Sequence, residues 1–336
     1  MTTPPMNPLL QVQDLSVRFV RKGEADVAAV DGVSFDVRPG EVVGLVGESG
    51  CGKSVTSLAI MGLLPGRTPR VGGSVLFSSG DESVDLLTLS DAELRERRGR
   101  DIGMVFQDPL SSLNPVVPVG VQITEALTRH RGMSKDEART EAVALLERVG
   151  IPDPARRVSA YPHQMSGGMR QRALIAIALA CRPKLLIADE PTTALDVTIQ
   201  AQILELLREL VAETGTALIM ITHDLGVVAG LCDRVNVLYG GRVVERAERH
   251  ALFGGPRHPY TSGLIRSIPR LDSDPAAELP AITGSVSDNL PWDHACAFAP
   301  RCPRALETCT SVTPVADDEA GRLLRCHNPE PIGATA

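Results

Sequence analysis

Short apolar runs separated by turns make up the first part of the chain. Leu10 to Val20 and Ala28 to Val37 alternate or cluster apolar residues, which predicts strands of an antiparallel layer. Val42 to Val46 contains only valine, glycine and leucine and predicts a buried strand. The segment Gly47 to Ser54 follows directly, and Val55 to Leu64 continues as a predicted helix. The order strand, glycine loop, helix is the one that a phosphate-binding loop requires.

A polar stretch and then a helical stretch follow. Residues 78 to 101 are polar, so we expect an exposed insertion in which Ser90-x-x-Glu93 caps a short charged helix. Val121 to His130 is a second predicted helix, and Ser134-x-x-Glu137 caps a third. These signals predict a helical subdomain over about residues 109 to 166.

Apolar strands and helices alternate from Ser166 onward, which predicts an α/β fold with a parallel sheet. The predicted elements are a helix at Ser166 to Cys181, a strand at Lys184 to Asp189, an amphipathic helix at Val197 to Glu213, a strand at Ala217 to Thr222, and a hairpin formed by Val235 to Tyr239 and Val243 to Glu245. After Tyr260 to Ile268 the chain becomes proline-rich and loses its periodicity, which predicts a separate C-terminal appendage from about residue 270.

Composition narrows the class of protein. The chain is 43% hydrophobic, and its richest apolar run, Ala173 to Cys181, is far shorter than a membrane span. Met1 to Pro8 lacks the basic and apolar regions of a secretory signal, so we expect a cytoplasmic protein that does not itself cross a membrane. The net charge of -7 argues against nucleic acid as the main partner, because phosphate neutralisation needs clustered cations.

The glycine loop carries the most specific chemical signal in the sequence. It fits the pattern G-x-x-x-x-G-K-[ST], in which backbone N–H groups and a helix N-terminus bind phosphates. Lys53 is expected to neutralise the β- and γ-phosphate oxygens of ATP, and Ser54 to bind Mg²⁺. The predicted nucleotide-binding residues are Gly47, Glu48, Ser49, Gly50, Cys51, Gly52, Lys53, Ser54 and Val55.

Two acids end a predicted buried strand downstream of this loop. Asp189 is placed to hold Mg²⁺ through water, and Glu190 to polarise an attacking water. A strand often ends in acidic residues, so this pair alone does not indicate a function. It indicates a nucleotide site because a phosphate loop lies upstream in the same chain.

With these motifs the sequence resembles the ATP-binding cassette family. The family signature Leu-Ser-Gly-Gly-Gln is represented by Ser166, Gly167 and Gly168, and the sequence departs from it with Met165 and Met169. The resemblance implies that this helix N-terminus caps the γ-phosphate bound by an opposing subunit, as its N–H groups and dipole allow. It also implies a P-loop NTPase (RecA-like) core with an antiparallel β subdomain, a helical subdomain and a C-terminal extension.

Four further residues acquire roles through the same resemblance. Gln107 resembles the Q-loop glutamine that touches Mg²⁺ or water, and His223 resembles the switch histidine at the γ-phosphate. Asp196, in Ala194-Leu195-Asp196, resembles the D-loop that crosses to the partner subunit. Phe19 lies where the family stacks an aromatic ring on adenine, although its alternation with neighbouring apolar residues also fits a core strand.

Two longer segments resemble one branch of the family. Both segments are similar to ATPase subunits of dipeptide/oligopeptide and nickel importers. The first ends at Pro115 and reads Phe-Gln-Asp-Pro-Leu-Ser-Ser-Leu-Asn-Pro; the second begins at His258 and reads His-Pro-Tyr-Thr-Ser-Gly-Leu. The resemblance implies an ATPase domain at 8–255 and a C-terminal extension at 256–336. It also implies a location at the cytoplasmic face of the membrane and three kinds of partner: a second ATPase copy or paralogue, two permeases and an extracytoplasmic solute-binding protein.

Three other functions remain open from the sequence. A nickel or other small-solute importer would use the same ATPase, because cargo passes through the permeases. A soluble ABC ATPase of DNA repair or translation usually needs a coiled-coil insertion or a second cassette, and only one phosphate loop occurs here. A non-hydrolysing scaffold is disfavoured by the presence of Lys53, Asp189 and Glu190.

Four of the seven cysteines gather in the proline-rich tail. Cys296, Cys302, Cys309 and Cys326 follow the spacing C-x5-C-x6-C-x16-C. A metal would supply the core that this tail lacks. The spacing lacks the C-x2-C pair typical of structural zinc, whereas four thiolates can hold a [4Fe-4S] cluster. The tail also resembles that of the related peptide-importer ATPases. Zn²⁺ and unliganded thiols remain as alternatives.

Overall fold

A computed structural model of the chain describes residues 7–20, 23, 26–66, 68–80, 82–193, 195–268, 282–286, 292–319 and 321–331. The chain divides into two compact units. Unit 1 comprises residues 1–9, 37–41 and 88–220, and unit 2 comprises residues 10–36, 42–87 and 221–336.

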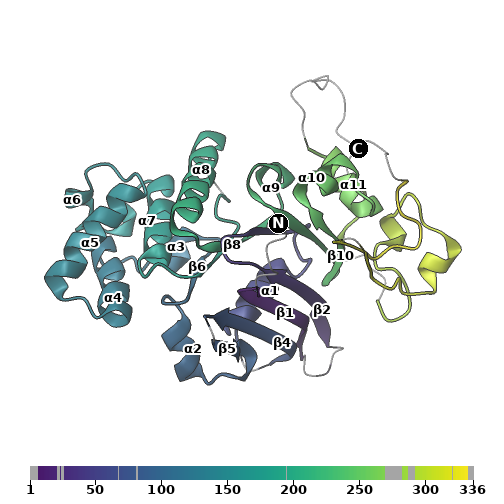
Figure 1. Cartoon of the computed structure of the whole chain (residues 1–336). Coiled ribbons are helices and arrows are strands. Elements are labelled where there is room, and N and C mark those ends of the chain that lie inside the picture. Colours follow the sequence, from purple (N-terminus) through teal and green to yellow (C-terminus); the bar gives the residue numbers. More distant parts are fainter. Residues whose placement is uncertain are drawn as a thin grey trace, which may run out of the picture. The chain divides into compact units, whose positions relative to one another are not determined.

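An antiparallel sheet forms the N-terminal part of unit 2 (purple and dark blue in Figure 1). Its strand order is β2-β1-β4-β5, with β1 at Leu10–Phe19, β2 at Val27–Val37, β4 at Pro69–Ser79 and β5 at Glu82–Asp85. Leu10, Val12, Leu15 and Val17 are buried, as their alternation predicts. The structure corrects one expectation: residues 78–85 belong to this sheet, because β5 pairs with the end of β4, and only the following segment leads to the capped helix α2 (Asp91–Arg97).

A second sheet of unit 2 carries the phosphate-loop segment. Strand β3 (Val42–Val46) pairs in parallel with β9 (Arg234–Tyr239), which forms an antiparallel hairpin with β10 (Arg242–Glu248). Strand β12 (Arg322–Leu324) then pairs with β10, and β11 (Asp317–Glu319) pairs with β12. The proline-rich tail therefore adds two strands to the same sheet as β3, a pairing that its weak periodicity did not predict.

The helices of unit 2 lie between these strands in the sequence. They are α1 (Lys53–Ile60), α9 (Leu225–Leu231), α10 (Arg249–Gly254) and α11 (Pro259–Arg266), with short 3-10 turns η1 (Leu86–Thr88), η4 (Ala299–Arg301) and η5 (Glu307–Thr310). Glu245 of β10 is fully buried and accepts hydrogen bonds from the backbone N–H groups of Arg257 and His258, so it ties the start of α11 to the sheet.

Unit 1 combines parallel strands with helices. Strand β6 (Ile102–Val105) pairs in parallel with β7 (Leu185–Asp189), and the N–H of Ala217, at the start of β8 (Ala217–Thr222), donates to the carbonyl of Lys184. The helices α7 (Gly167–Leu179) and α8 (Val197–Thr214) are the long helices expected in this region. The strand at β6 was not predicted, because it is short.

The helical part of unit 1 begins at Pro109, where the sequence predicts a helical subdomain (left in Figure 1). It contains α3 (Pro109–Ser112), α4 (Val119–Arg131), α5 (Lys135–Arg148), α6 (Pro154–Arg157) and the turn η2 (Pro162–Gln164). Ser90 and Ser134 both form complete capping boxes with the glutamate three residues later, as the sequence predicts.

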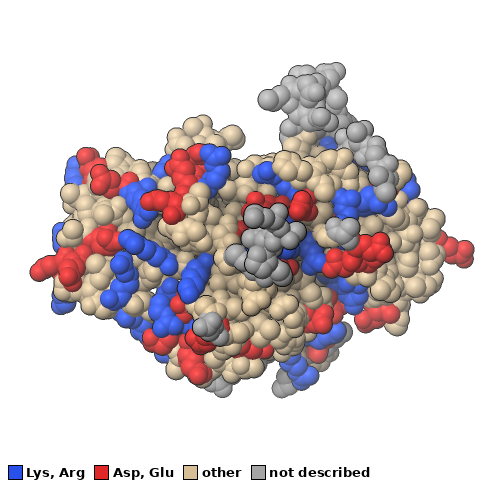
Figure 2. Space-filling model, viewed as in Figure 1, with Lys and Arg blue, Asp and Glu red and all other residues tan. Residues whose placement is uncertain are grey.

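Positive and negative side chains are interspersed on the face drawn in Figure 2. Exposed ion pairs of the chain include Arg95 with Asp91 and Arg129 with Glu96. Among the described residues, none of the helices combines the length and the apolar character needed to span a bilayer.

Candidate functional site

The glycine loop runs from the end of β3 at Val46 to the start of α1 at Lys53, as the sequence predicts. Gly47 and Gly52 both have positive φ angles, of 151° and 92°. A Cβ at Gly47 would lie 2.3 Å from the carbonyl oxygen of Leu238, and one at Gly52 would lie 2.3 Å from that of Ala29. The loop therefore needs glycine at both ends, because neighbouring backbone fills the space of a side chain.

Lys53 lies over this loop. Its side chain is nearly buried, with 5% exposure, and its Nζ donates to the carbonyl oxygens of Gly47 at 2.7 Å and Glu48 at 3.0 Å. Ser49 and Gly50 are exposed, whereas Cys51 is buried with its Sγ 4.0 Å from the hydroxyl of Tyr260. Ser54 and Val55, the next residues of α1, are half-buried. The ammonium group and the exposed loop backbone together form a cradle suited to an anion.

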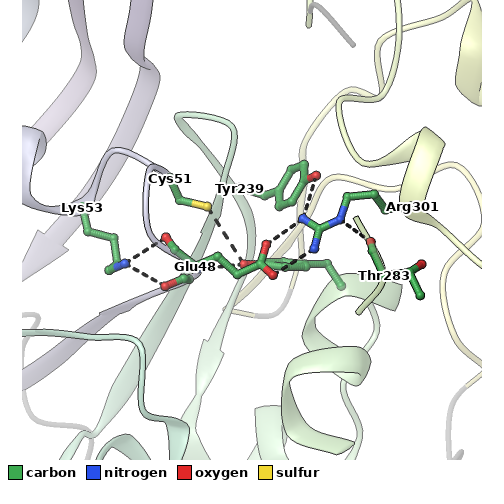
Figure 3. A network of polar contacts seen from close by, with 8 residues as sticks. Glu48, Cys51, Lys53, Tyr239, Thr283 and Arg301 are labelled. Atoms are coloured by element: carbon green, nitrogen blue, oxygen red, sulfur yellow. Dashed lines mark hydrogen bonds and ion pairs between the residues drawn. The ribbon is translucent and has the colours of Figure 1, made fainter. Parts of the chain in front are cut away.

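Two residues outside the predicted set contact the same loop (Figure 3). The Arg301 guanidinium forms an ion pair with the Glu48 carboxylate, and the Tyr260 hydroxyl accepts a hydrogen bond from the Glu48 N–H at 2.8 Å. Neither contact was predicted from the sequence, since neither residue belongs to a phosphate-loop pattern. The His258-Pro-Tyr segment was noticed, but only as a family resemblance.

In unit 1 the two acids at the end of β7 differ in environment. Asp189 is nearly buried, with 5% exposure, while Glu190 is half-buried and has a positive φ of 45°. Gln107 Nε2 donates to Glu190 Oε2 at 3.0 Å, and the Thr193 hydroxyl donates to the same oxygen at 2.8 Å. The structure therefore brings Gln107 and Glu190 together. A left-handed backbone is uncommon at a residue other than glycine, and such strained residues cluster at functional sites.

The Ser-Gly-Gly segment begins α7. Ser166 is exposed and is the N-cap of the helix, accepting from the N–H of Met169 at 3.3 Å. Gly167 is also exposed, and a Cβ at Gly168 would lie 2.8 Å from Cγ2 of Ile199. Asp196 is the N-cap of α8, where it accepts from the N–H of Ile199 at 3.0 Å. Ala194, the first residue of the predicted D-loop, lies outside the described residues.

His223 and Phe19 lie in unit 2. His223 is exposed and follows directly on β8, before Asp224 caps α9. Phe19 is the last residue of β1, is half-buried and lies opposite Pro69 in the pairing with β4. A place at the end of its strand leaves the Phe19 ring less covered than Val17, which is fully buried.

The four tail cysteines all lie in unit 2 and interact electrostatically. The Cys296 N–H donates to the carbonyl oxygen of Cys309 at 2.8 Å. Burial is the main cause that raises the pKa of Cys326 to about 12, and the charges of the other three cysteines act in the same direction. Burial also raises the pKa of Cys296 to about 11. Among the described residues, however, no group of three or more His, Cys, Asp or Glu side chains is placed to hold a metal ion.

Comparisons with known proteins agree on the family. The ABC transporter family model matches residues 30–193, and the model for the oligopeptide/dipeptide transporter C-terminal region matches residues 244–309. The chain is 51% identical to the oligopeptide transport ATP-binding protein OppD of Salmonella typhimurium, over 97% of this chain and 95% of that protein. It is 54% identical to the dipeptide transport ATP-binding protein DppD of Bacillus subtilis, over 92% of this chain and 91% of that protein.

Solved structures show the same fold. A dimeric, post-hydrolysis structure of the ATP-binding cassette MJ0796, bound to ADP and Pi, is 30% identical with a TM-score of 0.63, and the match covers 71% of this chain and 98% of that chain. The cbiO1 subunit of the cbiONQ ABC transporter complex from Clostridium perfringens gives a TM-score of 0.60 at 30% identity, covering 74% of this chain and 91% of that chain. The chain therefore belongs to the ABC transporter family, within the group of ATP-binding proteins that contains the oligopeptide and dipeptide transport proteins.

Proposed function

We propose that this chain is the ATP-hydrolysing subunit of an importer for dipeptides or oligopeptides. One observation carries the proposal: relatives that are about half identical over nearly the whole chain are peptide transport ATP-binding proteins, and the C-terminal extension is matched as well as the ATPase domain. The proposed boundaries are 8–255 for the ATPase domain and 256–336 for the extension.

The loop residues supply the binding chemistry. The N–H groups of residues 47–54 and the N-terminus of α1 bind the phosphates of ATP, and Lys53 moves from the carbonyls of Gly47 and Glu48 to the β- and γ-phosphate oxygens. The buried ammonium and the space kept open by glycine support this role. Ser54, Asp189 and Gln107 are the residues that would hold Mg²⁺, which when bound neutralises charge on the phosphates. Phe19 stacks on the adenine ring.

Glu190 acts as the general base that polarises the attacking water. Its carboxylate is held by Gln107 and Thr193, so one oxygen is oriented before any water arrives. His223 contacts the γ-phosphate. Ser166, Gly167 and Gly168 present a helix N-terminus to the γ-phosphate of a partner subunit, and Asp196 lies in the segment that crosses to that subunit. Hydrolysis therefore requires a second ATPase subunit, either another copy or a paralogue.

The partners at the membrane are two permeases and an extracytoplasmic solute-binding protein, with this chain peripheral at the cytoplasmic face. Leu110 and Val116 support a permease contact, because they follow the Gln107 segment and are 63% and 78% exposed. This surface would transmit changes at Gln107 to the permease.

We also infer that Cys296, Cys302, Cys309 and Cys326 hold a [4Fe-4S] cluster, with Zn²⁺ as the alternative. The electrostatic coupling of Cys326 to the other three thiols supports a shared site. The four side chains are not placed as ligands in this structure, so they would have to move and lose protons to bind a metal. Anaerobic purification followed by iron, zinc and sulfide analysis decides the matter. Cys302→Ser should lower the bound metal and Cys181→Ser should not; absence of both metals with four freely alkylated thiols would remove the site.

The peptide assignment is tested by purifying the chain from membranes of its source cells and identifying the permeases and binding protein that accompany it. The reconstituted complex should take up labelled dipeptides or oligopeptides in vesicles only when Mg-ATP is present on the side of this subunit. Uptake of Ni²⁺ without peptide uptake would make it a nickel importer, and purification without any membrane protein would overturn the transport role.

A further inference from the structure

The C-terminal extension contacts the phosphate loop through one arginine. Arg301, at the end of η4, forms a two-pronged ion pair with Glu48: Nη1 lies 2.6 Å from Oε2, and Nη2 lies 2.9 Å from Oε1. Figure 3 shows the guanidinium facing the Glu48 carboxylate, with Lys53 on the other side of the loop. Glu48 is the second residue of the loop, so this contact joins residues 253 positions apart.

Arg301 is held in place by other groups as well. Its Nε donates to the carbonyl oxygen of Thr283 at 2.8 Å, and its Nη1 donates to the Tyr239 hydroxyl at 3.2 Å. Only 3% of its side chain is exposed, and the guanidinium lies over the ring of Tyr239, 5.8 Å from the centroid. A guanidinium with this many fixed partners loses little entropy in pairing with a carboxylate, unlike a mobile surface arginine.

Glu48 has a second tie to the same region. Its backbone N–H donates to the Tyr260 hydroxyl at 2.8 Å. Burial raises the pKa of Tyr260, so this hydroxyl stays neutral. The rings of Tyr260, Tyr239 and Phe298 pack against one another with centroids 4.7 to 5.3 Å apart. Glu48 is thus fixed at its backbone by Tyr260 and at its side chain by Arg301.

These ties matter because of what the loop binds, so the inference rests on the proposed role of residues 47–54 in ATP binding. A carboxylate in a phosphate-binding loop repels a polyphosphate, and the repulsion grows with the charge of the ligand. An arginine that pairs with the carboxylate cancels most of this repulsion. The Glu48 carbonyl is also one of the two oxygens that hold Lys53, so fixing Glu48 fixes the starting position of the ammonium group.

We propose that Arg301 is a positioning residue of the nucleotide site, through which the C-terminal extension sets the affinity of the phosphate loop for ATP. It neutralises Glu48 and holds its side chain toward the extension. Removal of Arg301 leaves an unpaired carboxylate in the loop, which weakens the binding of ATP. Removal of both charges takes away this repulsion, so the affinity for ATP should return. An arginine that only stabilised the fold would not make nucleotide affinity depend on the charge at Glu48.

The test measures dissociation constants of Mg-ATP and Mg-ADP for the full-length chain by calorimetry. Arg301→Gln should weaken ATP binding roughly tenfold and ADP binding less, because ADP carries one negative charge fewer. Arg301→Lys, which keeps the charge but loses the two-pronged geometry, should show a smaller loss. The double variant Glu48→Gln with Arg301→Gln should bind ATP within roughly threefold of the unmodified chain.

Controls separate the possible failures. Circular dichroism verifies folding, and iron and zinc analysis shows whether a change beside Cys302 alters the metal content. If Arg301→Gln does not fold, the other two variants carry the test, because neither contains an unpaired Glu48 carboxylate. Arg301→Lys keeps a positive charge opposite Glu48, and the double variant removes both charges. Near-normal ATP affinity in both Arg301 variants, or a double variant as weak as Arg301→Gln, would overturn the inference. Normal ATP affinity in Lys53→Ala would instead overturn the proposed nucleotide site.

Discussion

Gln107 and Glu190 lie 83 residues apart in the sequence and are joined by a hydrogen bond in which Gln107 Nε2 donates to Glu190 Oε2 at 3.0 Å. The bond links the residue at the start of the helical part to the proposed general base. Because Leu110 and Val116 follow Gln107 and are exposed, a movement of this segment at a permease would reach the Glu190 carboxylate through one side chain. This relationship underlies the first two predictions.

Glu190→Gln should retain ATP binding and lose turnover by about 10² to 10⁴-fold, because an amide cannot accept the proton of the attacking water. The trapped state should be a pair of ATPase subunits bridged by ATP. Phosphate release and size-exclusion chromatography with Mg-ATP measure the two effects in the presence of the partner subunit. A variant that remains monomeric, or hydrolyses ATP at the normal rate, would contradict the role assigned to Glu190.

Val116→Asp should weaken assembly with the permeases, since it places a charge in an exposed apolar position. Nucleotide affinity should not change, because Val116 is not among the proposed ATP-binding residues and its side chain is 78% exposed. Pull-down of the permeases from detergent-solubilised membranes measures assembly. Val312→Asp is the matched control, because Val312 is also exposed, at 49%, but lies in the C-terminal extension. Equal loss of permeases in the two variants would argue against a docking role for the segment.

The positions of the motif residues could be predicted from the sequence, whereas many of the contacts around them could not. The strand, loop and helix at residues 42–60 and the strands that end at Asp189 and Thr222 were predicted, because fully apolar runs bounded by turns are strong signals. Strand β4 was not predicted, since Gly72 and Gly73 interrupt its apolar pattern. The Arg301 contact could not be predicted, because the tail around it lacks periodicity and its partner lies 253 residues away.

Close backbone approach at the phosphate loop gives a test of stability. Gly52 and Gly50 have similar positive φ angles of 92° and 84°. A Cβ added at Gly52 would lie 2.3 Å from the carbonyl oxygen of Ala29, whereas a Cβ added at Gly50 would have no neighbour within 4 Å. Both alanine variants place a side chain at a similar positive φ, so the difference between them mainly reports the steric overlap. We expect Gly52→Ala to be less stable than Gly50→Ala by about 1 to 3 kcal/mol in nucleotide-free chemical unfolding. Equal stability would mean that the loop relaxes freely.

His258 should make the fold sensitive to acid. Burial lowers its pKa to about 3, whereas an unfolded histidine titrates near 6.5. Below pH 6.5 the unfolded chain binds a proton that the folded chain does not, so stability present above that pH is lost as the pH falls toward 3. At pH 5 the loss attributable to His258 is about 2 kcal/mol.

Thermal unfolding between pH 7.5 and 5 measures this effect. In the unmodified chain, His258 Nδ1 accepts a hydrogen bond from the Tyr260 N–H. His258→Asn keeps an acceptor for this N–H but removes the titrating group, so it should flatten the pH dependence of stability. His250→Asn, at an exposed position, should leave it unchanged. A pH profile that is the same in all three proteins would show that His258 does not titrate as its burial implies.

The proposed role of the loop at residues 47–54 in ATP hydrolysis is tested most directly by the ATP turnover of the assembled transporter containing Lys53→Ala. Lys53 Nζ donates to the loop carbonyls of Gly47 and Glu48. Its removal takes away the cation that is proposed to bind the phosphates, so it should weaken ATP binding and lower phosphate release by about 10²-fold or more without unfolding the domain. Lys135→Ala, at an exposed lysine of α5, should behave as the unmodified chain. Near-normal hydrolysis by the Lys53→Ala transporter would contradict the account.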